Sequence, residues 1–299
     1  MRGKLRYKVA AAIMVIAVLF AAANPFCGFA DTSSGQNPLC LPILMYHEVK
    51  YESPGKDSIK PYELESDLRY LQSAGYHTIT MKQLIDYVYS GTPLPEKPII
   101  LSFDDGYLST YVYARPLLTK YKARIVLSII GKSTDDFSQK PSEDITAHMT
   151  WGQLNEMKDA GLAEIQNHTY NMHKITRRRY GCSKKQGESK ENYACALTED
   201  ITRMQADVFL HTGMTPTTFT YPYGQVCDDS LPVIKSLGFK AALTCKYGIN
   251  LITKDPTVLY GLRRICRAHG VTAKKSLDGA MKTLRFRKGY HIEKEADKT

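Results

Sequence analysis

The sequence predicts an α/β fold, a distorted and incomplete (β/α) barrel of about seven parallel strands in a single domain. Short apolar runs of strand length alternate with amphipathic helical stretches along most of the 299 residues, which is typical of a parallel sheet covered by helices. The number of repeats favours a nearly closed barrel over a small open sheet. Hydrophobic residues make up 43% and charged residues 23%, the balance of a globular chain that can bury a core.

The first 30 residues predict a secretory signal peptide. Four basic residues precede an apolar run over residues 9–23, and the segment ends in the small residue of Gly28-Phe29-Ala30. The run is short for a bilayer core, which needs roughly 20 residues as a helix; an uncleaved anchor is the alternative. Residues 31–40 are polar and turn-rich and are predicted to be a tether. We therefore expect a protein that is secreted or associated with the cell envelope, outside the cytoplasm.

Export affects how charge and cysteine content are interpreted. The net charge is +10, and residues 1–30 hold four basic and no acidic residues, so the rest of the chain is also basic. This favours an anionic wall or envelope surface as a partner, and export argues against nucleic acid. Six cysteines follow residue 30 without a CxxC pair, which argues against a zinc ribbon. Disulfides are permitted outside the cytosol, and Cys182 with Cys195 is the first pair we expect because both lie in one polar segment.

The elements of the first half follow from apolar spacing and from glycines that end helices. Leu64, Leu68 and Leu71 have helical spacing, and Gly75 ends that helix. The predicted elements are strands over residues 41–49, 77–80, 98–106 and 124–130, and helices over 62–74, 81–89 and 109–121. The run over 41–49 is apolar apart from one histidine and is predicted to be a buried strand.

The second half repeats the pattern after a predicted polar loop over residues 131–147. A helix from Thr150 to about Ala160 ends at Gly161, and a strand over 162–166 leads to His168. A basic, cysteine-bearing insertion is expected over 174–196, followed by a helix to about residue 211. The remaining predicted elements are strands over 218–220, 241–244 and 262–265 and a helix over 230–237. Residues 274–299 are charged and are predicted to form a helix or a loose tail.

Two adjacent acids end the strand over residues 98–106. Successive strand residues point to opposite faces, but Gly106 lets the chain turn sharply, so Asp104 and Asp105 can take different roles in one site. The alternative is an Asp-Asp-Gly turn that caps the next helix.

Two histidines lie five residues apart in a loop that follows a strand. His168 and His173 can both reach one ion, although a pair of surface histidines is the alternative. Two histidines with one carboxylate and open positions form a recurring catalytic metal set. Zinc in such a set lowers the pKa of bound water to about 7.

Three motifs in order resemble those of the NodB-type polysaccharide deacetylases, carbohydrate esterase family four. They are Ser102-Phe103-Asp104-Asp105-Gly106, the H-T-x-x-x-H run of residues 168–173, and Tyr221-Pro222-Tyr223-Gly224. The resemblance covers residues 41 to about 270. It implies a catalytic domain over 41–273, with the motif-bearing core from about residue 97 and the charged C-terminal tail over 274–299.

The resemblance implies a role for each matching residue. Asp104 matches the general base, and Asp105, His168 and His173 match the metal ligands. The backbone N–H of Tyr223 matches the donor to the oxyanion. The implied cofactor is a divalent metal, first of all Zn²⁺, with Co²⁺, Ni²⁺ or Fe²⁺ also compatible with a His₂Asp set.

The sequence departs from the family pattern at three places. The second histidine lies one residue further on than in the common motif, and Thr220 or Tyr221 replaces the arginine that opens the third motif. We expect Arg263 or Arg264 to restrain Asp104 instead. The usual C-terminal histidine motif has no clear counterpart, because His269 does not follow an apolar strand.

An acid histidine is predicted at the other end of the chain. Leu44-Met45-Tyr46-His47-Glu48 resembles the N-terminal motif of the poly-β-1,6-N-acetylglucosamine deacetylases, a branch of this family, and implies His47 as the general acid. A core histidine on an apolar strand is the alternative. Trp151, Tyr221 and Arg264 are the further candidates for contact with substrate, although a lone tryptophan is as often core.

The resemblance implies a secreted, monomeric polysaccharide N-deacetylase that hydrolyses carbon–nitrogen bonds. Its partner would be an N-acetylated exopolysaccharide, peptidoglycan or chitin-like polymer. Three alternatives remain: a non-catalytic glycan-binding protein on the same scaffold, an O-acetyl (xylan) esterase, and a non-haem iron oxygenase. The alternating helices argue against the oxygenase, whose usual scaffold is a jelly roll.

Overall fold

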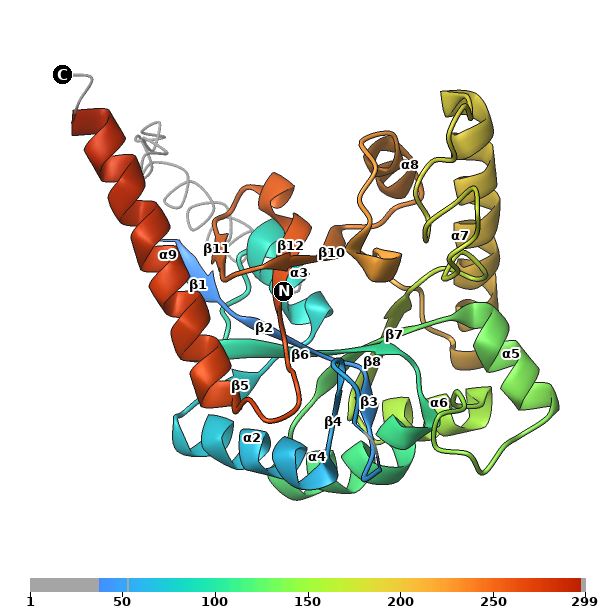
Figure 1. The fold of residues 1–299 in the computed structure, drawn as a ribbon, viewed down its shortest axis with the longest axis horizontal. Coiled ribbons are helices and arrows are strands. Elements are labelled where there is room, and N and C mark those ends of the chain that lie inside the picture. Colours follow the sequence, from blue (N-terminus) through green and yellow to red (C-terminus); the bar gives the residue numbers. More distant parts are fainter. Residues whose placement is uncertain (1–37, 53, 297–299) are drawn as a thin grey trace, which may run out of the picture. The chain divides into compact units, whose positions relative to one another are not determined.

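A ring of seven parallel strands forms the centre of this computed structural model, which describes residues 38–52 and 54–296 (Figure 1). The ring strands are β2 (Ile43–Tyr46), β6 (Pro98–Asp105), β7 (Ile125–Ile129), β8 (Ala163–Asn167), β9 (Thr218–Thr220), β10 (Ala241–Tyr247) and β12 (Tyr260–Cys266). Their order is β2-β12-β10-β9-β8-β7-β6, and pairing of β2 with β6 closes the ring. The predicted fold class is therefore confirmed.

Five short strands of the described part of the chain lie outside the ring. β1 (Leu39–Leu41) pairs antiparallel with β11 (Asn250–Ile252), and β3 (Glu48–Val49) pairs parallel with β4 (Ser58–Ile59). β5 (His77–Thr78) adds to the beginning of β6. The last two residues before the predicted domain, Leu39 and Cys40, thus belong to a strand rather than to a tether.

Helices and short helical turns lie between the strands and after the last strand. They are α2 (Pro61–Ser73), α3 (Met81–Ser90), the π-helical turn η1 (Thr110–Ala114) that continues into α4 (Arg115–Tyr121), α5 (Gly131–Gln139), α6 (Trp151–Asp159), α7 (Lys190–Thr212), the short turn η2 (Pro222–Gly224), α8 (Ser230–Ser236), η3 (Pro256–Leu259) and α9 (Ala273–Ala296). Local chemistry defines several ends: Thr80 and Thr150 cap α3 and α6 by accepting from Gln83 and Gln153, and Gly91 ends α3 with φ 74°. Among the described residues, none of these helices has the length and apolarity that a membrane span requires. The predicted signal peptide lies outside the described residues.

The central strand β6 shows how the core is divided. All eight of its residues are buried, as in a parallel strand covered on both faces. Leu101 and Phe103 pack in one cluster with Leu68 of α2, whereas Ile100 packs in another with Leu243 of β10. Because side chains alternate along a strand, Asp104 lies on the Ile100 side, inside the ring.

The polar loop predicted for residues 131–147 is wrong in its first part, which forms α5. The helix contains few apolar residues, so periodicity could not reveal it. Its start is held by the loop after β8, because the backbone N–H groups of Gly131 and Lys132 donate to the carbonyls of Thr169 and Tyr170 at 3.1 and 2.8 Å. Tertiary hydrogen bonds therefore replace the missing local signal.

Three other predictions need correction or refinement. The insertion was expected to extend to residue 196, but α7 begins at Lys190 because Ser189 caps it, accepting from Asn192 at 3.1 Å. The expected pairing of Cys182 with Cys195 is wrong: both cysteines are free, the first buried and the second exposed. The C-terminal segment is a helix as far as Ala296.

Candidate active site

The carboxyl ends of the ring strands place the predicted catalytic and metal-binding residues around one cavity of about 480 Å³. β2 leads to His47, β6 ends with Asp104 and Asp105, and β8 leads to His168. The other lining residues are Glu48, Gly55, Lys56, Asp57, Ser58, Tyr107, His173, Tyr223 and Cys245. Acids, imidazoles and two phenols thus meet where the strands end and the loops begin.

Asp105, His168 and His173 converge on one point. The Nε2 atoms of His168 and His173 lie 3.4 and 3.2 Å from Oδ1 of Asp105. That oxygen is buried and accepts no hydrogen bond from the described residues. A buried acceptor that faces two ring nitrogens fits a divalent cation, and the three ligand atoms all lie within 4.8 Å of one another.

The imidazole rings of His168 and His173 differ in their hydrogen bonding and in the charges around them. Nδ1 of His168 lies 2.8 Å from the carbonyl of Thr220, and a proton on Nδ1 would leave the Nε2 lone pair facing Asp105. Burial and the neighbouring His168 lower the pKa of His173 to about 4, so that this ring is neutral at pH 7. Burial alone would raise the pKa of Asp105, but the imidazoles beside it, His168 first, lower that pKa well below its usual range.

The loop from His168 to His173 is held by hydrogen bonds to its backbone. The Asp200 carboxylate on α7 accepts the N–H groups of Tyr170 and Asn171, both at 2.8 Å. Thr169 has φ 73°, and its N–H donates to the side chain of Asn167 at 2.8 Å. These bonds bring the second histidine to Asp105 despite the longer spacing.

Asp104 is fixed by a buried arginine. Nη1 of Arg264 donates to Oδ1 of Asp104 at 2.7 Å and to Ser102 at 2.8 Å, and the arginine is 1% exposed. Burial alone would raise the pKa of Asp104, but Arg264, followed by His168 and His47, lowers it. Arg264 thus restrains Asp104, one of the two arginines expected to do so, and it is not placed to contact substrate.

His47 approaches Asp104 from the other side. Its Nε2 lies 4.0 Å from Oδ2 of Asp104, the oxygen that Arg264 does not hold. Nδ1 of His47 is buried without a hydrogen-bond partner among the described residues. The ring is therefore a wall of the cavity and not a core histidine whose hydrogen bonds are satisfied.

Tyr223 lies beside the three candidate metal ligands and has a strained backbone conformation. Its φ is 55°, and its ring lies 4.3 Å from that of His173 between centroids. Asp105, with φ 69°, and Thr169 share this left-handed conformation, so each of the three motifs contains one such residue other than glycine. Each costs about 1–3 kcal/mol, and such strain tends to collect at functional sites. Gly224 cannot be replaced without a shift, because an added Cβ would lie 2.5 Å from Cβ of Cys245.

Trp151 and Tyr221, two of the residues predicted to contact substrate, are not brought to the cavity. Trp151 is 5% exposed, donates to Asp135 at 2.9 Å and stacks on His211. Tyr221 is 2% exposed and bonds through its hydroxyl to Ser230 at 2.8 Å. Both are core residues with satisfied polar atoms.

The segment between β3 and β4 contributes lining residues that were not predicted. Lys56 and Asp57 are exposed and line the cavity. No sequence signal marks them, because they lie in a polar stretch without a motif. Tyr107 could have been found, because it directly follows the Asp104-Asp105-Gly106 turn.

Comparison with known proteins agrees with this geometry. The sequence profile of the polysaccharide deacetylase family matches residues 91–242. A relative named poly-β-1,6-N-acetyl-D-glucosamine N-deacetylase from Escherichia coli strain K12 is 25% identical over 227 residues, which cover 69% of this chain and 34% of the relative. A relative of the same name from Staphylococcus aureus strain MRSA252 is 28% identical over 200 residues, covering 67% and 63%. The chain thus spans about a third of the length of the Escherichia coli relative and just under two thirds of the length of the Staphylococcus aureus relative.

A solved structure supports the same assignment. IcaB from Ammonifex degensii superposes with a TM-score of 0.66 at 25% identity, over 82% of this chain and 97% of that one. The family profile covers the β6 acids, the His168–His173 loop and the turn at Tyr223, the three motifs that meet at the cavity. The chain therefore belongs to the polysaccharide deacetylase family.

Proposed function

We propose that this chain is a metal-dependent, secreted hydrolase that removes N-acetyl groups from an amino-sugar polysaccharide of the exopolysaccharide type. The observation that carries the proposal is the grouping of two acids with different surroundings: Asp104, held by Arg264, and Asp105, facing two imidazoles. The family supplies the reaction class, and the relatives' names point to a β-1,6-linked N-acetylglucosamine polymer.

Asp105, His168 and His173 would hold the metal, with zinc as the first candidate. When bound, the ion would supply Lewis acidity and lower the pKa of water. The carboxylate, two imidazoles and open cavity beside them fit this use.

The other residues then divide the proton transfers of amide hydrolysis. Oδ2 of Asp104 accepts the proton of the attacking water, since Oδ1 is engaged by Arg264 and Ser102. The Tyr223 N–H donates to the oxygen on which negative charge develops. His47 donates a proton to the departing amine nitrogen, and its place on the cavity wall near Asp104 puts acid and base in one site.

Acetate release from N-acetylglucosamine polymers tests the proposal. We expect the purified chain, with zinc supplied, to release acetate from a β-1,6-linked polymer, and Asp105→Ala to lose at least about a hundredfold in rate together with its metal. Asp159→Ala, which removes an exposed acid on α6, is the matched control. Unchanged turnover in Asp105→Ala, or release from acetylated xylan alone, would reject the proposal.

A further inference from the structure

The segment between His173 and α7 folds into a small, ordered unit. Ile175 and Tyr180 form an antiparallel bridge, and Thr176 and Arg179 close the turn through a backbone bond of 2.9 Å, which places Arg177 and Arg178 at its tip. A second contact ties the following stretch, because Nη2 of Arg179 lies 2.7 Å from Glu188. The basic insertion is therefore a preformed surface rather than an unstructured run of charge.

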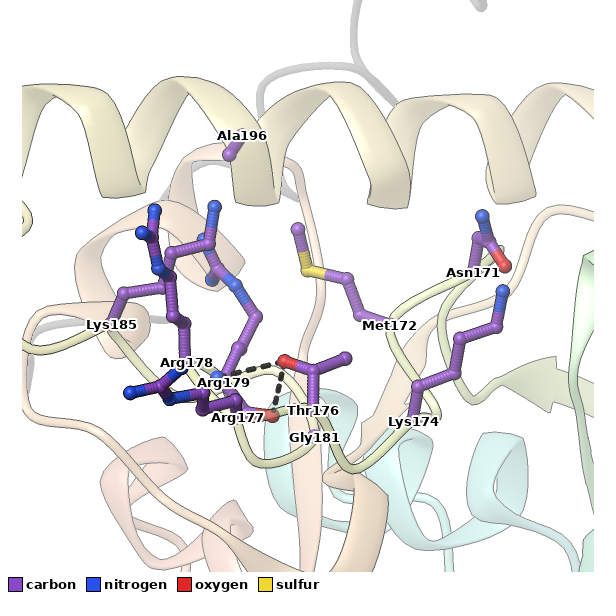
Figure 2. Close-up of a pocket in the computed structure, with 10 residues that line it drawn as sticks. All are labelled: Asn171, Met172, Lys174, Thr176, Arg177, Arg178, Arg179, Gly181, Lys185 and Ala196. Atoms are coloured by element: carbon purple, nitrogen blue, oxygen red, sulfur yellow. Dashed lines mark hydrogen bonds between the residues drawn. The ribbon is translucent and has the colours of Figure 1, made fainter.

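This segment lines an open cavity of about 540 Å³, which shares no lining residue with the one at Asp105. Figure 2 shows Arg177, Arg178 and Lys185 on one side, Lys174 on the other, and Met172 between them, below Ala196 of α7. The remaining lining residues are Asn171, Thr176, Arg179 and Gly181. The lining of the cavity is thus partly apolar, and cationic side chains form its rim.

All four cations of the insertion that have no acidic partner among the described residues line this cavity. Arg179 is paired with Glu188, and Lys184 and Lys190 are paired with Asp229. By contrast, the structure shows no ion pair with a described side chain for the four rim cations, Lys174, Arg177, Arg178 and Lys185. Like charges held together repel, and an anion between them relieves that repulsion. Two adjacent guanidinium groups also suit bidentate contact with phosphate or carboxylate oxygens.

The cationic cavity adjoins the candidate active site through shared segments. Met172 and Lys174 line it, while His173 between them lines the other cavity. Ring contacts also join the insertion to the site: the centroids of Tyr180 and Tyr223 lie 5.0 Å apart, and those of Tyr223 and His173 lie 4.3 Å apart. A polymer with its acetyl group at Asp105 could therefore place a neighbouring unit against the rim cations.

The chemistry of the product also argues for an anionic occupant. Each acetyl group removed from an amino sugar leaves a basic amine that is partly protonated near pH 7, so the rim repels a deacetylated stretch. An acetylated stretch that carries phosphate or carboxylate groups is attracted. We propose, resting on the proposed function, that this cavity is a subsite for an anionic group, phosphate or carboxylate, carried by the acetylated polysaccharide.

The test compares Arg177→Glu/Arg178→Glu with Lys122→Glu/Arg124→Glu, which makes the same charge change at exposed positions before β7. Substrates are neutral N-acetylglucosamine oligomers, the same oligomers bearing a phosphodiester, and a polymer of alternating N-acetylglucosamine and glucuronate. We expect the ratio of kcat/KM for an anionic substrate to that for the neutral oligomer to fall about tenfold in the insertion variant, mainly through KM. The control should keep the wild-type ratio. Arg177→Lys/Arg178→Lys, which keeps the charge, should give a ratio between those of the wild type and the glutamate variant. Whichever anionic substrate shows the larger change identifies the anion.

A binding measurement separates this proposal from the proposed function. Calorimetric titration of the same polymers into Asp104→Asn protein, at low and high salt, needs no turnover. Salt-sensitive binding of an anionic polymer that the insertion variant loses and the control keeps would support the subsite even if no acetate were released. Equal binding by the insertion variant and the control, or an unchanged substrate ratio, would overturn it.

Discussion

Asp104 and Arg264 form a buried ion pair inside the ring. The arginine is held in place by the Thr244 carbonyl at 2.8 Å and spans from β12 to the end of β6. Removing one partner of such a pair leaves a charge that burial has separated from water, which typically costs about 3–5 kcal/mol. The orientation of the proposed base and the stability of the ring therefore depend on the same contact.

A double-mutant cycle tests this dependence. We expect Arg264→Met to lower the free energy of unfolding by about 3–5 kcal/mol, and Arg264→Met/Asp104→Asn to lower it by less than the two single changes together, with a coupling above about 1 kcal/mol. Urea unfolding gives each value, and Arg124→Met at an exposed position controls for loss of a cation. Additive effects would show that the pair is not coupled.

The residues of the site differ in how far sequence could identify them. Asp104, Asp105, His168 and His173 lie in motifs at strand ends, so their convergence follows from the barrel itself. Arg264 could be named only as one of two arginines, because whether β12 turns residue 263 or 264 inward depends on register. The prediction that Trp151 and Tyr221 contact substrate is wrong, because composition does not show that residues of α5 and α7 contact Trp151 and that α8 contacts Tyr221.

At the scale of elements, Glu63 joins the start of α2 to the loop between β12 and α9. Its carboxylate accepts the N–H groups of Lys60 at 2.8 Å and Gly270 at 2.7 Å, and lies 2.7 Å from Nδ1 of His269. Burial alone would raise the pKa of Glu63, but these three partners lower it below its ordinary value. His269, which fits the family's usual C-terminal histidine motif poorly, therefore has Glu63 as its partner in the structure.

The lowered pKa of Glu63 predicts a pH-dependent contribution to stability. Because the folded-state pKa lies below the unfolded value of about 4.3, the contribution is complete above that value and is lost as the pH falls through the folded pKa. We expect Glu63→Gln to lower the free energy of unfolding by about 1–2 kcal/mol at pH 6.5 and by clearly less near pH 3. Urea unfolding across this range, with exposed Glu143→Gln as control, would contradict the prediction if the difference did not shrink.

Element types were predictable where periodicity was strong and failed where tertiary contacts decide. The helices over α2 and α3 and the strands β6 and β9 follow from apolar spacing and from capping residues. α5 has too few apolar residues to show a period, and its start depends on carbonyls of the loop after β8. β11 is three residues long and exists through its pairing with β1, some 200 residues earlier in the chain.

At the scale of the whole molecule, the proposed metal ligands join parts of the ring that the sequence separates. Asp105 ends β6, whereas His168 and His173 follow β8, with β7 between the two strands in the sheet. An ion that binds only the folded state stabilises it by about 2.7 kcal/mol at a free concentration 100 times its Kd. The metal should therefore act on the stability of the barrel as well as on chemistry.

Thermal unfolding with and without metal measures this link. Since 1 kcal/mol shifts Tm by about 2–4 °C in a domain of this size, we expect a chelator to lower the Tm of the wild-type chain by roughly 5–10 °C and added Zn²⁺ to restore it. Burial and His168 keep His173 neutral at pH 7 and thus able to bind a metal. Because His173→Ala lacks this ligand, the Tm of the variant should hardly respond to Zn²⁺. His77→Ala, at an exposed position on β5, should respond as the wild type does. An equal response of the two variants would place the ion elsewhere, whereas a response confined to His77→Ala and the wild type ties the barrel's stability to the Asp105 site.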